Sequence, residues 1–184
     1  MKEVFKSLAK EVLKVFLVVV FVVLPIRYFV FQPFIVRGSS MEPNFQDADY
    51  LIVDQMTYRF FDPQRGDVIV FENPDISDKK YIKRVIGLPK EEVIVEGTEV
   101  VIKNQEGEVV LEENYISGKN QPTFFRGEKN FILGEEEYFV LGDNRKASYD
   151  SRAWGGLSDD YIIGRVLFQI SLFDKFSKPK TPEY

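Results

Sequence analysis

Two residue types on which many hydrolases depend are missing from this chain of 184 residues, which contains no cysteine and no histidine. Without cysteine, the chain has no disulfides, no thiolate nucleophile and no zinc site with cysteine ligands. Without histidine, a Ser-His-Asp triad and a histidine-ligated metal are excluded. We therefore expect no metal and no cofactor, and any nucleophilic serine must be activated by another kind of side chain.

Positive charge is scarce outside the N-terminal region. The formal net charge is −5, and the excess of basic over acidic residues in 1–31 is +3, which leaves −8 for the rest of the chain. A globular part this acidic argues against nucleic acid as the main partner.

The N-terminal region holds the longest apolar run, the twelve residues Val15–Ile26. The flanking Lys14 and Arg27 can extend their charged ends towards lipid headgroups, so the usable length approaches the ~20 residues of a spanning helix. Lysines concentrate before the run, which by the positive-inside rule predicts a cytoplasmic N-terminus. We predict a single-pass helix within 1–31 that anchors the chain in the plasma membrane, with the remainder on the extracytoplasmic side.

Two alternatives compete with this anchor. A cleaved signal peptide would end in small residues at its cut site, and the sequence RYFVFQPFIV that follows the run contains no such site. A buried core helix is the other alternative, since twelve apolar residues also suit that role. The apolar character all round the helix and the basic flanks favour the anchor.

Beyond residue 31, short segments rich in β-branched and aromatic residues alternate with Gly, Pro and Asn turns, which predicts a mainly β domain. We expect a polar loop over 114–130 and a polar tail over 174–184. The predicted strands are 34–37, 50–54, 68–72, 81–87, 92–96, 99–103, 109–111, 137–141 and 161–170.

Three segments contain residues suited to chemistry. In the first, Ser40 follows a turn at Gly38 and Ser39. A serine in such a turn can expose its hydroxyl beside unpaired backbone N–H groups, which are the donors an oxyanion hole requires. Taken alone, a Gly-Ser-Ser sequence is more often an ordinary loop.

The second segment places Lys83 on a strand face with Tyr81 and Val85. The simple interpretation is a lysine at a strand edge with its ammonium in solvent. A buried lysine is the functional interpretation: its ordinary pKa is about 10.4, and burial lowers that pKa towards the range where a neutral amine can deprotonate a serine.

The third segment, 142–152, is polar and carries charges of both signs. It is either a solvated loop or a rigid loop held by pairs such as Asp150 with Arg152. Exposed pairs of this kind contribute little stability, whereas buried pairs can fix the geometry of a loop.

Taken together, these segments and a fourth resemble four motifs of the type I signal peptidases, in matching order and spacing over about residues 10–170. The resembling segments are Gly38-x-Ser40-Met41-x-Pro43, Arg65-Gly66-Asp67-Val68-Ile69-Val70-Phe71, Lys83-Arg84-Val85-Ile86-Gly87-Leu88-Pro89 and Gly142-Asp143-Asn144-Arg145-x-x-Ser148-x-Asp150-Ser151-Arg152.

The resemblance implies a role for each matching residue. Ser40 is the implied nucleophile, with its own N–H in the oxyanion hole, and Lys83 is the implied general base. Ser148 would hydrogen-bond to Lys83 and orient it, while Asp150 and Arg152 support that loop. An ion pair between Asp143 and Arg84 is a further structural expectation. Shallow apolar pockets for substrate are expected among Phe34, Val36, Met41, Tyr81 and Ile82.

The resemblance also implies an organisation into a β-sheet catalytic core, 32–90 with 137–173, and a smaller β subdomain inserted at 91–136. Residues 1–31 form the anchor, and 174–184 a C-terminal tail.

Two positions depart from the family pattern. Gly38 stands where some members have a serine that helps to hold the oxyanion, and Lys90-Glu91 replace the usual Gly-Asp after Pro89.

The function implied by the resemblance is removal of signal peptides from exported preproteins by a membrane-anchored endopeptidase. Its partners would be preproteins, the lipid bilayer and the export machinery. One alternative is a related Ser–Lys protease that processes a dedicated substrate. Another is an inactive membrane-tethered binding module, since a fold alone does not establish an activity.

Overall fold

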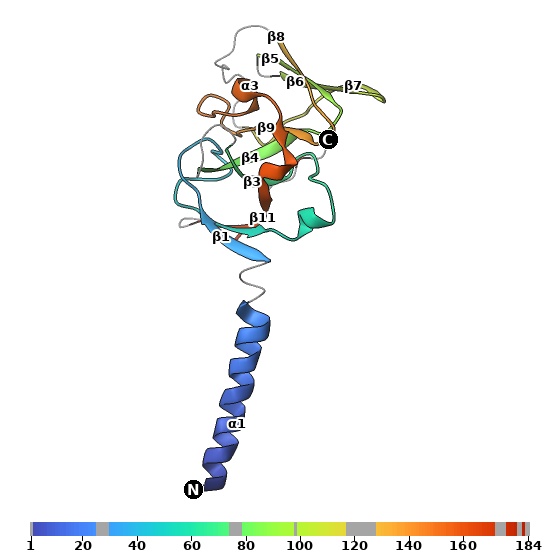
Figure 1. Cartoon of the computed structure of the whole chain (residues 1–184). Helices are drawn as coiled ribbons and strands as arrows, with labels where there is room; N and C mark the ends of the chain where they lie inside the picture. The colour runs from blue at the N-terminus through green and yellow to red at the C-terminus, as the bar shows by residue number, and fades with distance from the viewer. Residues whose placement is uncertain are drawn as a thin grey trace.

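The structure is a computed structural model that describes residues 2–24, 30–73, 79–97, 99–116, 128–171, 176–179 and 182. Helix α1 (Lys2–Val18) continues into a π-helical turn (Val19–Val23). All the other long elements are strands, arranged in two sheets (Figure 1). The prediction of a mainly β protein is therefore confirmed.

The larger sheet has seven strands in the order β1-β2-β11-β3-β4-β9-β10, with antiparallel neighbours. Their bounds are β1 Phe31–Ile35, β2 Tyr50–Asp54, β3 Val68–Glu72, β4 Lys80–Gly87, β9 Glu137–Leu141, β10 Leu157–Ser158 and β11 Ile162–Ile170. Strand β4 is interior, because β3 pairs with it on one side and β9 on the other. Its residues are buried from Ile82 to Gly87, which matters for the lysine that it carries.

The smaller sheet has the order β7-β6-β5-β8, again antiparallel. Its strands are β5 Glu92–Glu96, β6 Glu99–Asn104, β7 Gly107–Val110 and β8 Glu128–Ile132. All four lie in the range predicted as an insertion, but whether 91–136 is a domain of its own stays a prediction. Strand β8 is a correction, because the loop predicted over 114–130 includes its first residues; residues 117–127 lie outside the described part of the chain.

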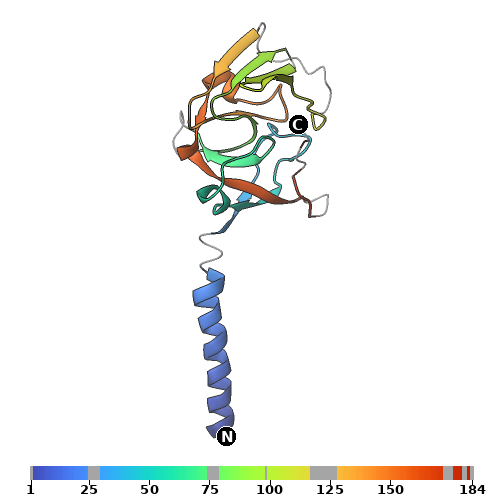
Figure 2. The same ribbon diagram turned by 90° about the vertical axis from the view of Figure 1, so that its right-hand side faces the viewer.

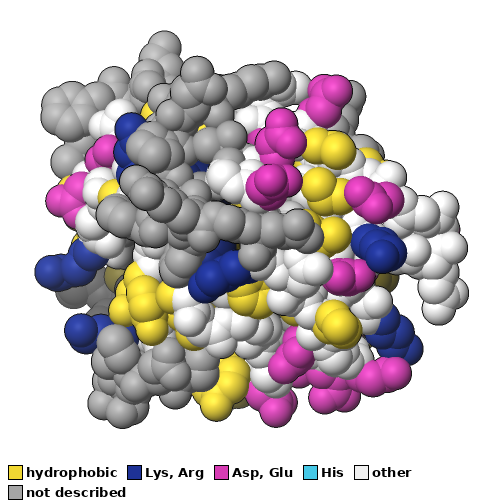
Figure 3. Space-filling view, turned by 90° about the horizontal axis from the view of Figure 1, so that it is seen from above, with side chains coloured by type: hydrophobic (Ala, Val, Ile, Leu, Met, Phe, Trp, Pro, Cys, Tyr) yellow, Lys and Arg dark blue, Asp and Glu magenta, His cyan; other side chains and the backbone are white. Residues whose placement is uncertain are grey.

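Alternation along β5 and β6 divides the small sheet into two faces. Val93, Val95, Val100 and Ile102 point inwards and pack with Ile86 and Phe139 of the larger sheet. The outward face carries glutamates beside partly exposed apolar side chains, as expected for strands with one face in solvent. Acidic and apolar side chains are both visible at this end of the molecule (Figure 3).

Three short helices complete the described elements. Two are 3₁₀ turns, Thr57–Arg59 and Asp159–Tyr161. Helix α3 (Ser151–Trp154) is a single turn that begins where the Asp150 side chain accepts a hydrogen bond from the Arg152 N–H. Asp150 is thus an N-cap, a role for which aspartate is among the preferred residues.

Helix α1 extends away from the two sheets (Figures 1 and 2). The prediction of a membrane-spanning helix in 1–31 is not met within the described residues, where no helix has both the length and the apolar composition to cross a membrane. Charged residues recur along α1 as far as Lys14, and the end of the predicted apolar run, 25–29, lies outside the described residues.

Candidate active site

Ser40 and Lys83 meet through their side chains. The Lys83 Nζ donates a hydrogen bond of 2.8 Å to the Ser40 Oγ and a second, of 2.9 Å, to the Ile82 carbonyl oxygen. Lys83 lies opposite Ile69 of β3 in the interior of the large sheet, and only 2% of its surface is exposed. A hydroxyl and a buried amine therefore face each other at hydrogen-bonding distance.

Burial changes the chemistry of this amine. Loss of hydration lowers the pKa of Lys83 from 10.5 to about 8, and Arg152 acts in the same direction. The Asp150 and Asp143 carboxylates oppose this effect. With a pKa near 8, about half of the lysine is neutral at that pH, whereas well under ~1% of an ordinary lysine is. The amine is thus able to accept a proton under mild conditions.

The segment that carries Ser40 is held by both its backbone and its core contacts. Gly38 adopts a left-handed conformation (φ 88°), which favours glycine, and its N–H donates to Asp47 Oδ1 at 2.7 Å. Met41 is fully buried in the cluster that includes Val36 and Phe45. The turn therefore projects Ser40 from a fixed base.

One backbone donor at Ser40 is available to a ligand. Asn144 binds the carbonyl oxygens of Ser39 and Ser40. Its backbone N–H donates to the Ser40 oxygen at 3.0 Å and its Nδ2 to the Ser39 oxygen at 3.1 Å. The Ser40 N–H, in contrast, meets no acceptor among the described residues. A free N–H beside a nucleophilic oxygen is the kind of donor that stabilises an oxyanion.

The loop before α3 is closed by the predicted pair of Asp150 and Arg152. Arg152 donates to the Asp150 carboxylate through Nε at 2.8 Å and through Nη2 at 2.9 Å, and both side chains are buried. The same carboxylate accepts the Gly142 N–H at 3.0 Å. Asp150 therefore joins both ends of the loop, and this burial excludes the alternative of a solvated loop.

Arg84 and Asp143 form a second buried pair. The guanidinium binds the carboxylate through Nε at 2.9 Å and Nη2 at 2.8 Å, and its Nη1 donates to the Gly66 oxygen at 2.9 Å. Asn44 adds a hydrogen bond from its Nδ2 to Asp143 at 2.9 Å. This pair connects β4 with the 142–152 loop, and Asn44 extends the connection to the segment of Ser40.

The predicted hydrogen bond from Ser148 to Lys83 is not present. Lys83 donates to Ser40 and Ile82 instead, and the Ser148 Oγ is shielded from solvent and meets no hydrogen-bond partner in the described part of the chain. Ser148 nevertheless lies beside the site, because a Cβ built on Gly142 would come within 2.2 Å of the Ser148 Oγ and 2.5 Å of the Ser40 oxygen. Gly142 therefore lies between the two serine segments, where a larger side chain has no room.

We expect Gly142→Ala to cost about 1–3 kcal/mol of unfolding free energy, as overpacking does, and to lower kcat as well, because the atoms that must move belong to Ser40 and Ser148. Gly134→Ala is the control, since its added Cβ meets only the Glu137 side chain, at 3.3 Å or more. Urea unfolding and initial rates measure both effects. Equal results for the two variants would contradict the close approach.

The five predicted pocket residues do not gather in one place. Val36, Met41 and Ile82 are buried in one core cluster with partly buried Phe34, whereas Tyr81 packs against another. The alternation of β4 places Tyr81 on the opposite face from Ile82, so the candidates fall on two sides of the sheet, and the shallow pockets expected among them stay a prediction.

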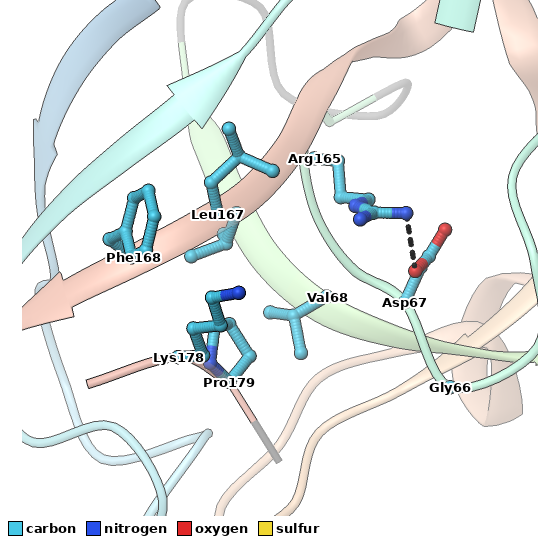
Figure 4. Close-up of a pocket in the computed structure, with 9 residues that line it drawn as sticks. Gly66, Asp67, Val68, Arg165, Leu167, Phe168, Lys178 and Pro179 are labelled. Carbon is cyan, nitrogen blue, oxygen red and sulfur yellow. Dashed lines mark ion pairs between the residues drawn. The ribbon is translucent and has the colours of Figure 1, made fainter. Parts of the chain in front are cut away.

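Two cavities lie away from the contact between Ser40 and Lys83. One of about 160 Å³ is lined by residues that include Arg165 and Phe168 of β11, Asp67 and Lys178, with Arg165 and Asp67 paired across it (Figure 4). A larger one, of about 430 Å³, lies between 43–46 and 176–179. Neither contains Ser40 or Lys83, and no acidic cluster in the described residues is arranged to hold a metal ion.

Comparison with known proteins identifies the family. The sequence pattern of the family described as "Signal peptidase, peptidase S26" matches residues 9–171. The chain belongs to this family. Probable signal peptidase I-2 of Synechocystis sp. is 37% identical to it, over 85% of this chain and 70% of that protein. Signal peptidase IB of Staphylococcus aureus (strain COL) is 32% identical, over 95% of this chain and 97% of that protein.

Among solved structures, a crystal structure of a signal peptidase I from Enterococcus faecalis V583 is 31% identical, with a TM-score of 0.47, and covers 57% of this chain and 97% of that chain. The expected membership of the signal peptidase family is confirmed by the sequence comparisons, and the chain is accordingly a peptidase. The matched range, residues 9–171, covers the site described above.

Proposed function

We propose that this chain is a serine endopeptidase that removes signal peptides from exported preproteins, with Ser40 as nucleophile and Lys83 as general base. The observation that carries the proposal is the 2.8 Å contact between the Ser40 Oγ and the buried Lys83 Nζ. A chain without histidine needs another base for its serine, and a lysine whose pKa is lowered to about 8 is a suitable one.

In the first step, neutral Lys83 takes the proton of the Ser40 hydroxyl while the Oγ attacks the carbonyl carbon of the scissile peptide bond. The Ser40 N–H donates to the resulting oxyanion. The Lys83 ammonium then returns the proton to the leaving amine, and an ester on Ser40 remains. Water, deprotonated by Lys83, hydrolyses this ester and regenerates the serine.

The proposed substrates are signal peptides, which have small residues at positions −1 and −3 before the cut. An extended peptide would bind by backbone hydrogen bonds, with its side chains in shallow pockets. Phe34, Val36, Met41 and Ile82 stay candidates for such a pocket, because they surround the segment that carries Ser40. Tyr81 is a candidate on the other face of β4, the one that carries Lys83, whose Nζ lies 5.5 Å from the centre of the Tyr81 ring.

The proposal places the enzyme at the plasma membrane, with a cytoplasmic N-terminus and the catalytic sheets outside. In support, the large apolar side chains described between Leu8 and Leu24, except Val20, are 38% to 71% exposed, as expected of side chains that contact lipid or a partner. Such a position would bring the site to the surface where preproteins emerge, beside the export machinery.

The test is cleavage of a preprotein with an Ala-x-Ala site by the full chain in detergent, beside the same preprotein with the −1 alanine replaced by phenylalanine. We expect cleavage after the −1 alanine, identified by mass spectrometry, and a rate about 100-fold lower for the bulky residue. If folded wild type cuts neither substrate, the proposal is wrong, and a dedicated substrate or an inactive binding module becomes the better interpretation.

A further inference from the structure

The segment 113–115 carries no motif, yet it contacts all three parts of the site. It follows β7 and Leu111, whose N–H donates to the Val100 oxygen at 2.9 Å and whose side chain packs in the core under the small sheet. Two side chains of the segment turn inwards, since the exposed fraction is 8% for Tyr115 and 7% for the side chain of Glu113. The small sheet thus delivers two buried polar groups towards the site.

Glu113 contacts the loop that follows β9. Its carboxylate pairs with the Nη2 of Arg145, a residue that is itself 3% exposed, and accepts the Tyr115 hydroxyl at 2.5 Å. Arg145 in turn donates through Nε to the Gly142 oxygen at 3.2 Å, and its own carbonyl accepts the Arg152 Nη2 at 2.8 Å. Glu113 therefore neutralises the cation around which the 142–152 loop is folded.

Tyr115 contacts the other two parts of the site. Its ring lies under the Arg84 guanidinium at 4.2 Å, a distance typical of a cation–π contact. Its carbonyl accepts a hydrogen bond of 3.0 Å from the Nδ2 of Asn44, which also donates to Asp143. Tyr115 thus touches both β4, next to Lys83, and the segment that begins with Ser40.

We propose that Glu113 and Tyr115 are positioning residues, which hold the Ser40 segment, β4 and the 142–152 loop in the arrangement that brings the serine and the lysine together. The inference rests on the proposed roles of Ser40 and Lys83. It assigns a part in the reaction to a segment outside the four motifs, and it makes the small sheet a support for the active site.

The consequence of losing this support follows from the groups around Lys83, which are Asp143, Asp150, Arg152, the Tyr81 ring and Ser40. Without Glu113, Arg145 would be a buried cation without its carboxylate, and the loop would have to open to hydrate it. Water that enters favours the ammonium form and raises the pKa of Lys83 from about 8 towards 10.5. Less lysine is then neutral at any given pH, so the acid limb of the rate profile moves to higher pH.

The experiment compares Glu113→Ala and Tyr115→Ala with Glu113→Gln, Tyr115→Phe and the exposed neighbour Glu112→Ala, in the full chain. We expect the two alanine variants at the site to lower kcat by about 10- to 100-fold, as misplacement of reacting groups does. The acid limb of the pH–rate profile of these two variants should move to higher pH by about one unit. Their KM should change less than their kcat. Tyr115→Phe keeps the ring and should recover most of kcat, whereas Glu113→Gln keeps an oxygen acceptor but not the negative charge beside Arg145 and should recover only part of it. Glu112→Ala should match wild type.

A second readout does not need turnover. The Nζ chemical shift of Lys83 in lysine-labelled protein, assigned by its absence in Lys83→Ala, reports the pKa directly. If the Lys83 pKa and the acid limb of the rate profile are unchanged in Glu113→Ala and Tyr115→Ala, the inference is wrong. This holds also if activity falls, because the fall then reflects only a smaller folded fraction. If wild type cuts no preprotein but Lys83 shifts in these variants, the proposed function fails and the positioning role stands.

Discussion

Lys83→Met is expected to reduce preprotein cleavage by about 10⁴-fold or more while leaving the protein folded. The loss in rate follows because no histidine is present to replace the lysine as a base, and water in the site is a far weaker one. Methionine is close to lysine in volume and removes a buried amine, so stability should be kept or raised. Ser40→Ala should lose activity to a similar extent, because both residues are proposed to act in the same step.

Matched controls separate these losses from general damage. Ser39→Ala changes the neighbouring hydroxyl, and Lys79→Ala removes an exposed lysine just before β4; both should cleave at nearly the wild-type rate. The measurement is the initial rate of cleavage of the Ala-x-Ala preprotein by each variant. If Lys83→Met stays within about tenfold of wild type, the lysine is not the general base, even if Ser40 proves essential.

The second large effect is on stability. Asp143→Ala should lower the free energy of unfolding by about 3–5 kcal/mol, because it leaves the Arg84 guanidinium buried without its carboxylate. Both members of the pair are at most 1% exposed. Urea unfolding in detergent can be followed through Trp154, the single tryptophan, whose ring packs against Phe71.

A second ion pair of the same length is the control. Lys90 and Glu135 are also 2.8 Å apart, but their side chains are 62% and 80% exposed. Glu135→Ala should therefore cost about 0–1 kcal/mol. Replacing both partners of the buried pair, as Arg84→Met with Asp143→Leu, should recover part of the loss. Similar unfolding midpoints for Asp143→Ala and Glu135→Ala would show that burial does not govern the strength of these pairs.

The local sequence pattern was sufficient to predict most of the strands. The segments predicted at 50–54, 68–72, 92–96 and 137–141 coincide with β2, β3, β5 and β9. Their β-branched and aromatic residues are locally consistent with a strand, and the turns beside them set their limits. Strand β8 did not follow from local pattern, because Glu128–Ile132 begins with polar residues and becomes a strand by pairing with β5. The single turn of α3 was also missed, since four residues give no helical periodicity.

The predictions about the active site also divide into those that the sequence supported and those that needed the tertiary structure. The absence of histidine and cysteine, the order of the motifs and the lysine on an apolar strand face are properties of the sequence. They were sufficient to predict the family, and the lysine as general base stays a prediction. The tertiary structure alone brought Ser40 and Lys83, 43 residues apart, to hydrogen-bonding distance and left the Ser148 hydroxyl without a hydrogen bond among the described residues. It also placed Glu113 against Arg145, 32 residues away. Such contacts depend on how separate strands pack into a sheet, and the short-range patterns of a sequence do not determine that packing.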